Sequence, residues 1–252
     1  MRCVNEASLF KNNCFVTLTY DDNNIPANGS IDVAEIQLFM KRLRKKFSGV
    51  ECVVNSAGKD SYPIRYFHCG EYGEALKRPH YHVLFFNFDF FDKFYWSTKN
   101  GSKLYRSPAL EVLWPYGMST IGDVTFESAA YVSGYIMKKI NGDMAESHYK
   151  GLKPEYVTMS RRPGIGYRWF QKYKDEIKNF DSVVVRGREV KPAKYYDRLL
   201  EVEDVEAYNR NKLARRPVDL GVMLDNINDR LVVKEVVAKA GASQYTRDME
   251  AL

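Results

Sequence analysis

The sequence predicts an α+β fold in which helices pack on an antiparallel sheet. Residues 14–20 and 64–72 are rich in β-branched and aromatic side chains, which is typical of strands. Residues 32–47 place apolar side chains at helical spacing. The segment 73–79 is polar, contains glycine and proline, and is short enough to join two antiparallel strands as a hairpin. These patterns predict alternating strands and helices around one core.

The remaining elements follow along the chain. A third strand is predicted over residues 80–86, and a short helix over 108–114 begins with proline at its favoured first position. Residues 117–125 are expected to form a fourth strand and 128–140 a further helix. The order β-α-β-β-α-β followed by a helix is the ferredoxin-like, or RRM-like, arrangement of four antiparallel strands with helices on one face.

We expect two domains of unequal size. Residues 1–180 contain all the predicted strands and form the main domain. Residues 181–252 are charged and periodic, are punctuated by prolines, and predict a mostly helical C-terminal extension. This extension is suited to covering the domain, to self-association or to binding a host replication protein, and the sequence does not select among these roles or fix an oligomeric state.

Composition limits the partners that the chain is expected to have. The formal net charge of +6 favours polyanionic partners without establishing one. The apolar stretches are far too short to span a bilayer, and the first residues lack the apolar segment of a signal peptide. We therefore expect a soluble protein of the cytoplasm that has no membrane partner.

Two histidines alternate on a predicted strand. His80 and His82 flank Tyr81, and because side chains at i and i+2 share one face of a strand, the two imidazoles project together. Two imidazoles so placed suit a divalent metal, which needs a third ligand. Glu71 lies across the predicted hairpin and is the natural carboxylate, with Glu74 in the loop as a reserve. An H-x-H pair alone is a weak signal, and ordinary polar or core histidines are the alternative.

Two tyrosines stand one turn apart on a predicted helix. Tyr131 and Tyr135 are four residues apart, so their hydroxyls lie on one surface; Lys138 shares this face and Lys139 flanks it. Aromatic residues at helical spacing usually belong to the core, and this helix does carry an apolar stripe. The tyrosines lie off that stripe, and burial of the lysine would be costly. We expect the face to open to solvent or to a ligand phosphate.

A metal beside a tyrosine pair suits the cleavage and rejoining of a DNA strand. A tyrosine hydroxyl, with a pKa of about 10, is a weak nucleophile at neutral pH, and the charge of a phosphodiester repels a phenolate. A metal ion on the non-bridging oxygens offsets that charge in the transition state, and a lysine adds to the effect. A second tyrosine would permit a second cleavage. The candidate catalytic residues are Tyr135, Tyr131 and Lys138.

Three segments, in this order, resemble the HUH endonucleases, and specifically the replication initiators of microvirus-type (gokushovirus-like) single-stranded DNA bacteriophages. Residues 15–20 resemble the first family motif, a core strand. Residues 69–73 followed by 78–82 resemble the metal motif with its upstream acid, and 131–139 resemble the two-tyrosine helix. Residues 160–166 are also similar to a segment of the phage proteins. The ordered combination is specific, whereas each piece alone is not.

The resemblance implies an activity and a set of residues. It implies a nick at a single-stranded DNA origin that depends on Mg²⁺ or Mn²⁺. The nick leaves a 5′-phosphotyrosine link and a 3′-hydroxyl that primes rolling-circle synthesis. It implies His80, His82 and Glu71 as metal ligands, and Tyr135 and Tyr131 as nucleophiles. The origin sequence, the physiological metal and the order in which the tyrosines act are not implied.

Several cations are candidates for DNA binding. Arg78 lies beside the histidines, Lys139 beside the tyrosine pair, and Arg161 with Arg162 precedes aromatic residues that could stack on bases. Two alternative functions remain open. A ferredoxin-like sheet also serves non-enzymatic nucleic-acid-binding proteins, and a relaxase or transposase relative would share the nicking chemistry while serving another biological task.

Overall fold

The computed structural model describes most of the chain as two compact units, divided between Trp169 and Phe170. The predicted domain boundary after residue 180 stays a prediction. Within the described residues, no helix is long and apolar enough to cross a membrane. Side chains are not described for residues 135–138 and 242–243. The described residues are 1–48, 64–73, 76–140, 142, 144–215 and 227–243.

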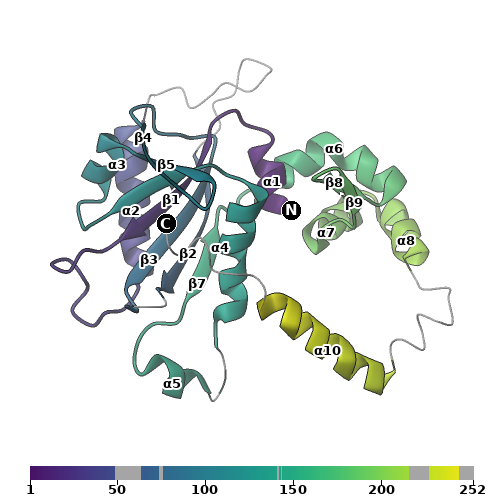
Figure 1. Cartoon of the computed structure of the whole chain (residues 1–252). Coiled ribbons are helices and arrows are strands. Elements are labelled where there is room, and N and C mark those ends of the chain that lie inside the picture. Colours follow the sequence, from purple (N-terminus) through teal and green to yellow (C-terminus); the bar gives the residue numbers. More distant parts are fainter. Residues whose placement is uncertain (49–63, 74–75, 141, 143, 216–226, 244–252) are drawn as a thin grey trace. The chain divides into compact units, whose positions relative to one another are not determined.

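The first unit is built around a seven-stranded antiparallel sheet with the strand order β4-β5-β6-β1-β3-β2-β7 (Figure 1). The strands are β1 Asn13–Thr19, β2 Arg65–Tyr72, β3 Pro79–Phe86, β4 Phe94–Lys99, β5 Ser102–Arg106, β6 Ser119–Gly122 and β7 Tyr156–Met159. The helices that begin in this unit are α1 Arg2–Ala7, α2 Val33–Lys46, α3 Pro108–Leu113, α4 Phe126–Lys138, α5 Met144–Tyr149 and α6 Tyr167–Phe180.

The predicted α+β class is confirmed. The predicted order β-α-β-β-α-β is found as β1, α2, β2, β3, α3 and β6. The sheet is larger than expected, because β4 and β5 form a hairpin that pairs with β6 and β7 pairs with β2. The hairpin turns at Asn100 and Gly101, both of which have positive φ. Its β4 side chains are largely exposed at the sheet edge, which explains why residues 88–107 lack a clear strand pattern.

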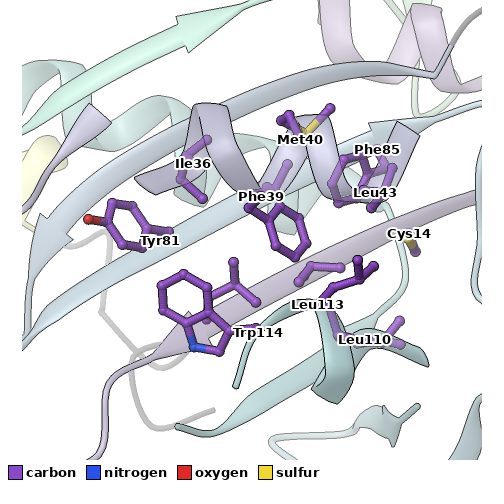
Figure 2. Packing of buried hydrophobic residues seen from close by; sticks show 14 of the residues in the cluster. Cys14, Ile36, Phe39, Met40, Leu43, Tyr81, Phe85, Leu110, Leu113 and Trp114 are labelled. Carbon is purple, nitrogen blue, oxygen red and sulfur yellow. The ribbon is translucent and has the colours of Figure 1, made fainter. Parts of the chain in front are cut away.

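One face of the sheet packs against α2 and α3. Asp32 caps α2 by accepting a hydrogen bond from the backbone N–H of Ala34 at 3.0 Å, which fixes where the helix begins. Phe39 of α2 and Trp114, directly after α3, are fully buried with Tyr81 of β3. Figure 2 shows these side chains converging between the helices and the strands. Such burial is the main source of stability for both helices.

The opposite face of the sheet packs against α1 and α4, so the expectation that helices lie on one face only is wrong (Figure 1). Thr125 caps α4 through a capping box with Ser128. Val132 of α4 is buried with Leu84 of β3 and Phe15 of β1. Because strand side chains alternate, the even-numbered residues of β3 face α4, whereas its odd-numbered residues face α2. This alternation places α4 on the histidine side of the sheet.

A buried ion pair joins three distant segments of the first unit. Glu6 of α1 contacts Arg65 Nε at 2.5 Å, and its other oxygen accepts from the backbone N–H of Gly166 at 2.6 Å. Arg65 Nη2 donates to the carbonyl oxygen of Pro163 at 2.7 Å. Both charges are almost completely shielded from water. Removal of one partner would leave the other charge buried and uncompensated.

We expect Glu6→Ala to destabilise the protein strongly. Breaking a buried pair in this way costs about 3–5 kcal/mol of unfolding free energy. Urea denaturation followed by circular dichroism measures this loss, and Glu146→Ala, at an exposed position of α5, is the matched control. A loss below about 1 kcal/mol, the typical value of a surface pair, would contradict the assignment.

The second unit contains the C-terminal helices and one hairpin. Its elements, besides most of α6, are β8 Val183–Val185, β9 Arg188–Val190, α7 Lys194–Glu203, α8 Val205–Ala214 and α10 Asn228–Ser243. Arg215 forms ion pairs with Asp181 and Asp197, and these carboxylates raise the pKa of its guanidinium. The expected helical extension is confirmed, with the β8–β9 hairpin as an addition that the sequence pattern did not predict.

Candidate active site

The β2–β3 hairpin brings a carboxylate to the two predicted metal-binding histidines. Glu71 of β2 is the direct cross-strand partner of His80, and His82 lies two residues further along β3. His82 Nε2 contacts Glu71 Oε1 at 2.6 Å, and both side chains are at most 3% exposed. The imidazole rings of His80 and His82 lie nearly parallel, with centroids 6.5 Å apart. The sheet therefore gathers these three side chains on the face that α4 covers.

Two threonines of β1 hold the imidazole rings from behind. Thr17 Oγ1 lies 3.0 Å from Nδ1 of His82, and Thr19 Oγ1 lies 2.9 Å from Nδ1 of His80. These pairs are direct cross-strand neighbours in the β1–β3 ladder. In the tautomer that carries the proton on Nδ1, each ring donates to its threonine and keeps the Nε2 lone pair for a ligand. Such a partner on the far nitrogen is a usual feature of metal-binding histidines.

Helix α4 brings the first tyrosine into the same site. Tyr131 Oη lies 3.4 Å from both Glu71 Oε1 and His82 Nε2. Its ring packs edge-to-face on the imidazole of His82, with centroids 5.1 Å apart, and edge-to-face on Phe15 at 6.4 Å. The hydroxyl that the sequence marked as a candidate nucleophile is therefore adjacent to the candidate metal ligands. The aromatic contacts fix the direction in which it points.

Other predicted residues of this region are only partly described. Tyr135 and Lys138 belong to α4 by their backbone, one and two turns beyond Tyr131, but their side chains lie outside the described residues. Glu74 also lies outside the described residues. Lys139 is the C-cap of α4 and is exposed. The roles predicted for these four residues therefore stay predictions.

The donor set suits a divalent cation. Two imidazole nitrogens and one carboxylate are ligands that several divalent metals accept. Among the described residues, no three His, Cys, Asp or Glu side chains already stand at the spacing of a bound metal. The reason lies in the 2.6 Å contact between His82 Nε2 and Glu71 Oε1, which engages the two donor atoms with each other. A cation has to displace this hydrogen bond to bind.

Gly73 leaves room beside the His80 ring. A Cβ atom at this position would stand 2.7 Å from His80 Nε2, closer than real Cβ contacts. We expect Gly73→Ala to displace the imidazole and weaken binding of Mn²⁺ by roughly 10–100-fold, the usual effect of disturbing the surroundings of a metal ligand. Isothermal titration measures the affinity. Gly241→Ala, where the added Cβ meets no atom within 4 Å, is the control. Equal affinities for the two variants would contradict this placement of His80.

The predicted DNA-binding arginines do not form one group. Arg78 lies at the start of β3 and forms an ion pair with the exposed Asp22 at 2.5 Å. Arg161 and Arg162 follow β7 and are exposed. Arg161 lines a cavity together with side chains of α2, on the face of the sheet opposite to the histidine pair. The structure therefore does not bring Arg161 to the candidate active site.

Comparison with known proteins places the chain in a family. Residues 13–140, just over half of the sequence, match the model of a family of replication-associated proteins of the ORF2 type. The chain belongs to this family. The matched residues include β1, the β2–β3 hairpin and α4, which are the elements that build the candidate active site.

The relatives of this chain within the replication-associated proteins come from bacteriophages and a related virus. It is 33% identical over 198 residues to replication-associated protein VP4 of Bdellovibrio phage phiMH2K, and 34% identical over 225 residues to replication-associated protein ORF2 of Spiroplasma virus 4. These matches cover 78% and 82% of the chain, but only 60% and 65% of the relatives. The chain thus spans less than two thirds of their length. No solved structure matches.

Sequence reasoning missed three contributors to this replication-protein site. Thr17 and Thr19 were read only as part of a core strand, and Gly73 only as part of a turn. The i, i+2 spacing of the threonines matches that of the histidines and could have suggested a ladder of partners. The aromatic residues Trp169 and Phe170 were expected to pack in the core, and both are buried.

Proposed function

We propose that this protein nicks and rejoins single-stranded DNA through a 5′-phosphotyrosine intermediate, as a rolling-circle replication initiator of the HUH type. The observation that carries the proposal is the position of Tyr131 Oη, 3.4 Å from both Glu71 Oε1 and His82 Nε2. A phenol beside a carboxylate and a histidine pair suits phosphoryl transfer to tyrosine. Membership of a replication-associated protein family supports the same biological role.

The reaction proposed is an exchange of one phosphoester for another. The tyrosine oxygen forms a bond to phosphorus while the bond from phosphorus to O3′ breaks. The phenol loses its proton to water, and O3′ gains one and leaves as a free 3′-hydroxyl. The number of phosphoester bonds is unchanged, so no nucleotide cofactor is needed, and the reverse attack by a 3′-hydroxyl rejoins the strand.

The side chains already described have distinct tasks in this reaction. His80, His82 and Glu71 would hold Mg²⁺ or Mn²⁺, which supplies charge neutralisation at the non-bridging phosphate oxygens. Thr17 and Thr19 keep the two rings oriented through Nδ1. The packing of α4 on the sheet keeps the tyrosine within reach, so that little orientational freedom is lost when DNA binds.

The second tyrosine gives the proposed enzyme a second nucleophile. Tyr135 lies one helical turn beyond Tyr131, so the backbone of α4 carries both residues on one face. While one tyrosine is linked to DNA, the other is available to attack a second phosphodiester. Lys138, a further turn along, would add positive charge beside the phosphate. This arrangement suits a cycle in which a completed strand is released and the next is started.

The proposed partners follow from the chemistry. The DNA substrate is the single-stranded origin of the replicating genome, contacted by exposed cations that include Lys139 and Arg162. Arg78 contributes if DNA phosphate replaces Asp22 as its partner. Host replication proteins would extend the released 3′-hydroxyl, which places the reaction in the cytoplasm of the bacterial host. The C-terminal unit is the candidate surface for such host proteins.

A covalent-adduct assay tests the proposal. The protein is incubated with labelled single-stranded origin DNA and Mn²⁺, and the products are separated on a denaturing gel. We expect a metal-dependent band in which the DNA label migrates with the protein and disappears after protease treatment. The absence of such a band with every divalent metal, while DNA binding is retained, would instead favour a non-enzymatic nucleic-acid-binding protein.

A further inference from the structure

A second polar cavity lies on the sheet face that packs against α2. Its volume is about 420 Å³, within the range of about 300–1,000 Å³ typical of small-ligand sites. It is bounded by α2 and by the two strands at one edge of the sheet, β2 and β7. His68 of β2 lies on its floor and is paired with Val83 of β3, whereas His82 is paired with Cys69. Alternation along the strand therefore turns His68 away from the candidate active site.

The charge of the cavity lining favours an anion. Lys41 and Arg44 project from α2, and Arg161 follows β7 on the other side. Among the described residues that line the cavity there is no carboxylate. Three cations around one cavity repel one another unless an anion lies between them. Phosphate and carboxylate groups are the anions that such donors bind best.

Two buried polar groups of the lining await a hydrogen-bond partner. In the part of the chain that the structure describes, neither His68 Nδ1 nor Tyr156 Oη has one, and His68 is 1% exposed. An unsatisfied buried polar group is costly, and native proteins contain few. Burial lowers the pKa of His68 to about 3, so its ring is neutral and offers one donor and one acceptor. The ligand is therefore expected to have neutral polar groups as well as charge.

Aromatic side chains give the cavity flat walls. The ring of Tyr66 contacts the guanidinium of Arg44, with the Arg44 Cζ atom 5.8 Å from the ring centroid. The ring of Tyr156 lies over Gly70, where a Cβ atom would stand 2.6 Å from Tyr156 Cε1. Only glycine at this position lets the ring approach the sheet so closely. Flat aromatic walls beside cations are typical of sites that stack a nucleobase and bind its phosphate.

We propose that this cavity binds a nucleoside phosphate, with the phosphate on Lys41, Arg44 and Arg161 and the base against the tyrosines, where His68 and Tyr156 bond its polar edge. The inference goes beyond the proposed function, because the cavity lies on the other face of the sheet and cannot hold the phosphate that is cleaved. The ligand is either a free nucleotide or one nucleotide of a DNA strand that passes around the β7 edge.

Affinity measurements with charge-reversed variants test the proposal. The full chain is kept in EDTA, so that binding is measured without any metal-dependent contribution or nicking. Thymidine monophosphate and a labelled oligothymidylate are the two probes. We expect Lys41→Glu to weaken binding of at least one probe by about tenfold or more, as befits loss of a charged hydrogen-bond donor. Lys45→Glu makes the same charge change on α2 outside the cavity and should have little effect.

The two probes distinguish the sources of the ligand. Selective loss of thymidine monophosphate binding identifies a free-nucleotide site, and selective loss with the oligomer alone identifies a DNA-strand site. Equal weakening by Lys41→Glu and Lys45→Glu, or no measurable binding of either probe, would overturn the proposal. Neither result bears on the covalent adduct, so a failure here is distinct from a failure of the proposed nicking activity.

Tyr156→Phe provides a test that does not depend on charge. The hydroxyl that it removes has no hydrogen-bond partner in the free protein as described, so the variant should be as stable as the parent or more stable. Its affinity for the probe that binds should nevertheless fall several-fold. Unchanged affinity with intact stability would show that the hydroxyl does not meet a ligand and would contradict the assignment of this group.

Discussion

Replacement of both Tyr131 and Tyr135 by phenylalanine is expected to abolish DNA cleavage and covalent attachment. Each substitution removes only a hydroxyl, so the edge-to-face packing of Tyr131 on His82 and Phe15 is retained and the fold should be intact. Loss of the attacking oxygen in enzymes that use a covalent nucleophile lowers the rate by on the order of 10⁴-fold or more. Single-turnover cleavage of labelled origin DNA measures the effect.

The single tyrosine variants and a matched control sharpen this result. Tyr131→Phe should eliminate the nucleophile that lies beside Glu71, while Tyr135→Phe reports on the residue whose side chain is not described. Tyr95→Phe, on the exposed β4 strand, removes a hydroxyl remote from α4 and should cleave at the parental rate. Cleavage by the double variant at more than about one hundredth of the parental rate would exclude both tyrosines as the nucleophile.

Glu71→Gln is expected to be nearly as damaging, for a different reason. Glutamine keeps the size of the side chain and can still bond His82 Nε2, so the buried contact is preserved. It removes the negative charge that the proposed divalent cation requires. We expect metal affinity to fall by at least about 10-fold to 100-fold and metal-dependent cleavage to fall at least as much. Titration with Mn²⁺ and single-turnover kinetics measure the two quantities.

Thermal unfolding separates loss of metal from loss of structure in this variant. A ligand that binds only the folded state raises the melting temperature of the parent as its concentration rises. Glu71→Gln should melt near the metal-free parent and show no such rise, whereas Glu146→Gln, at an exposed site, should behave as the parent does in both respects. A full metal-induced stabilisation in Glu71→Gln would show that this carboxylate is not a ligand.

Local patterns in the sequence were sufficient for the elements that carry the candidate site. The alternation of His80, Tyr81 and His82 identified the face of β3, and the short connection to β2 placed Glu71 across from it. The four-residue spacing placed Tyr131 and Tyr135 on one face of α4. These inferences succeed because strand and helix periodicities are local properties that one segment determines by itself.

The features that were missed depend on contacts between distant segments. The threonine partners of the histidines arise from the β1–β3 ladder, in which Thr17 meets His82 at a separation of 65 residues. The position of α4 on the second face depends on which apolar surfaces β1 and β3 leave uncovered by α2. The alternation of β7 is short, and its pairing with β2 closes only when the whole sheet forms. No local periodicity encodes such pairings.

Mass spectrometry of the trapped protein–DNA adduct tests the central claim most directly. Complete tryptic digestion yields one peptide, residues 107–138, that contains both Tyr131 and Tyr135. After nuclease trimming, we expect this peptide to carry a 5′-nucleotide on a tyrosine oxygen, and fragmentation should locate the link at Tyr131 or Tyr135. A nucleotide attached to any other peptide, or to a residue of this peptide other than those two tyrosines, would contradict the account.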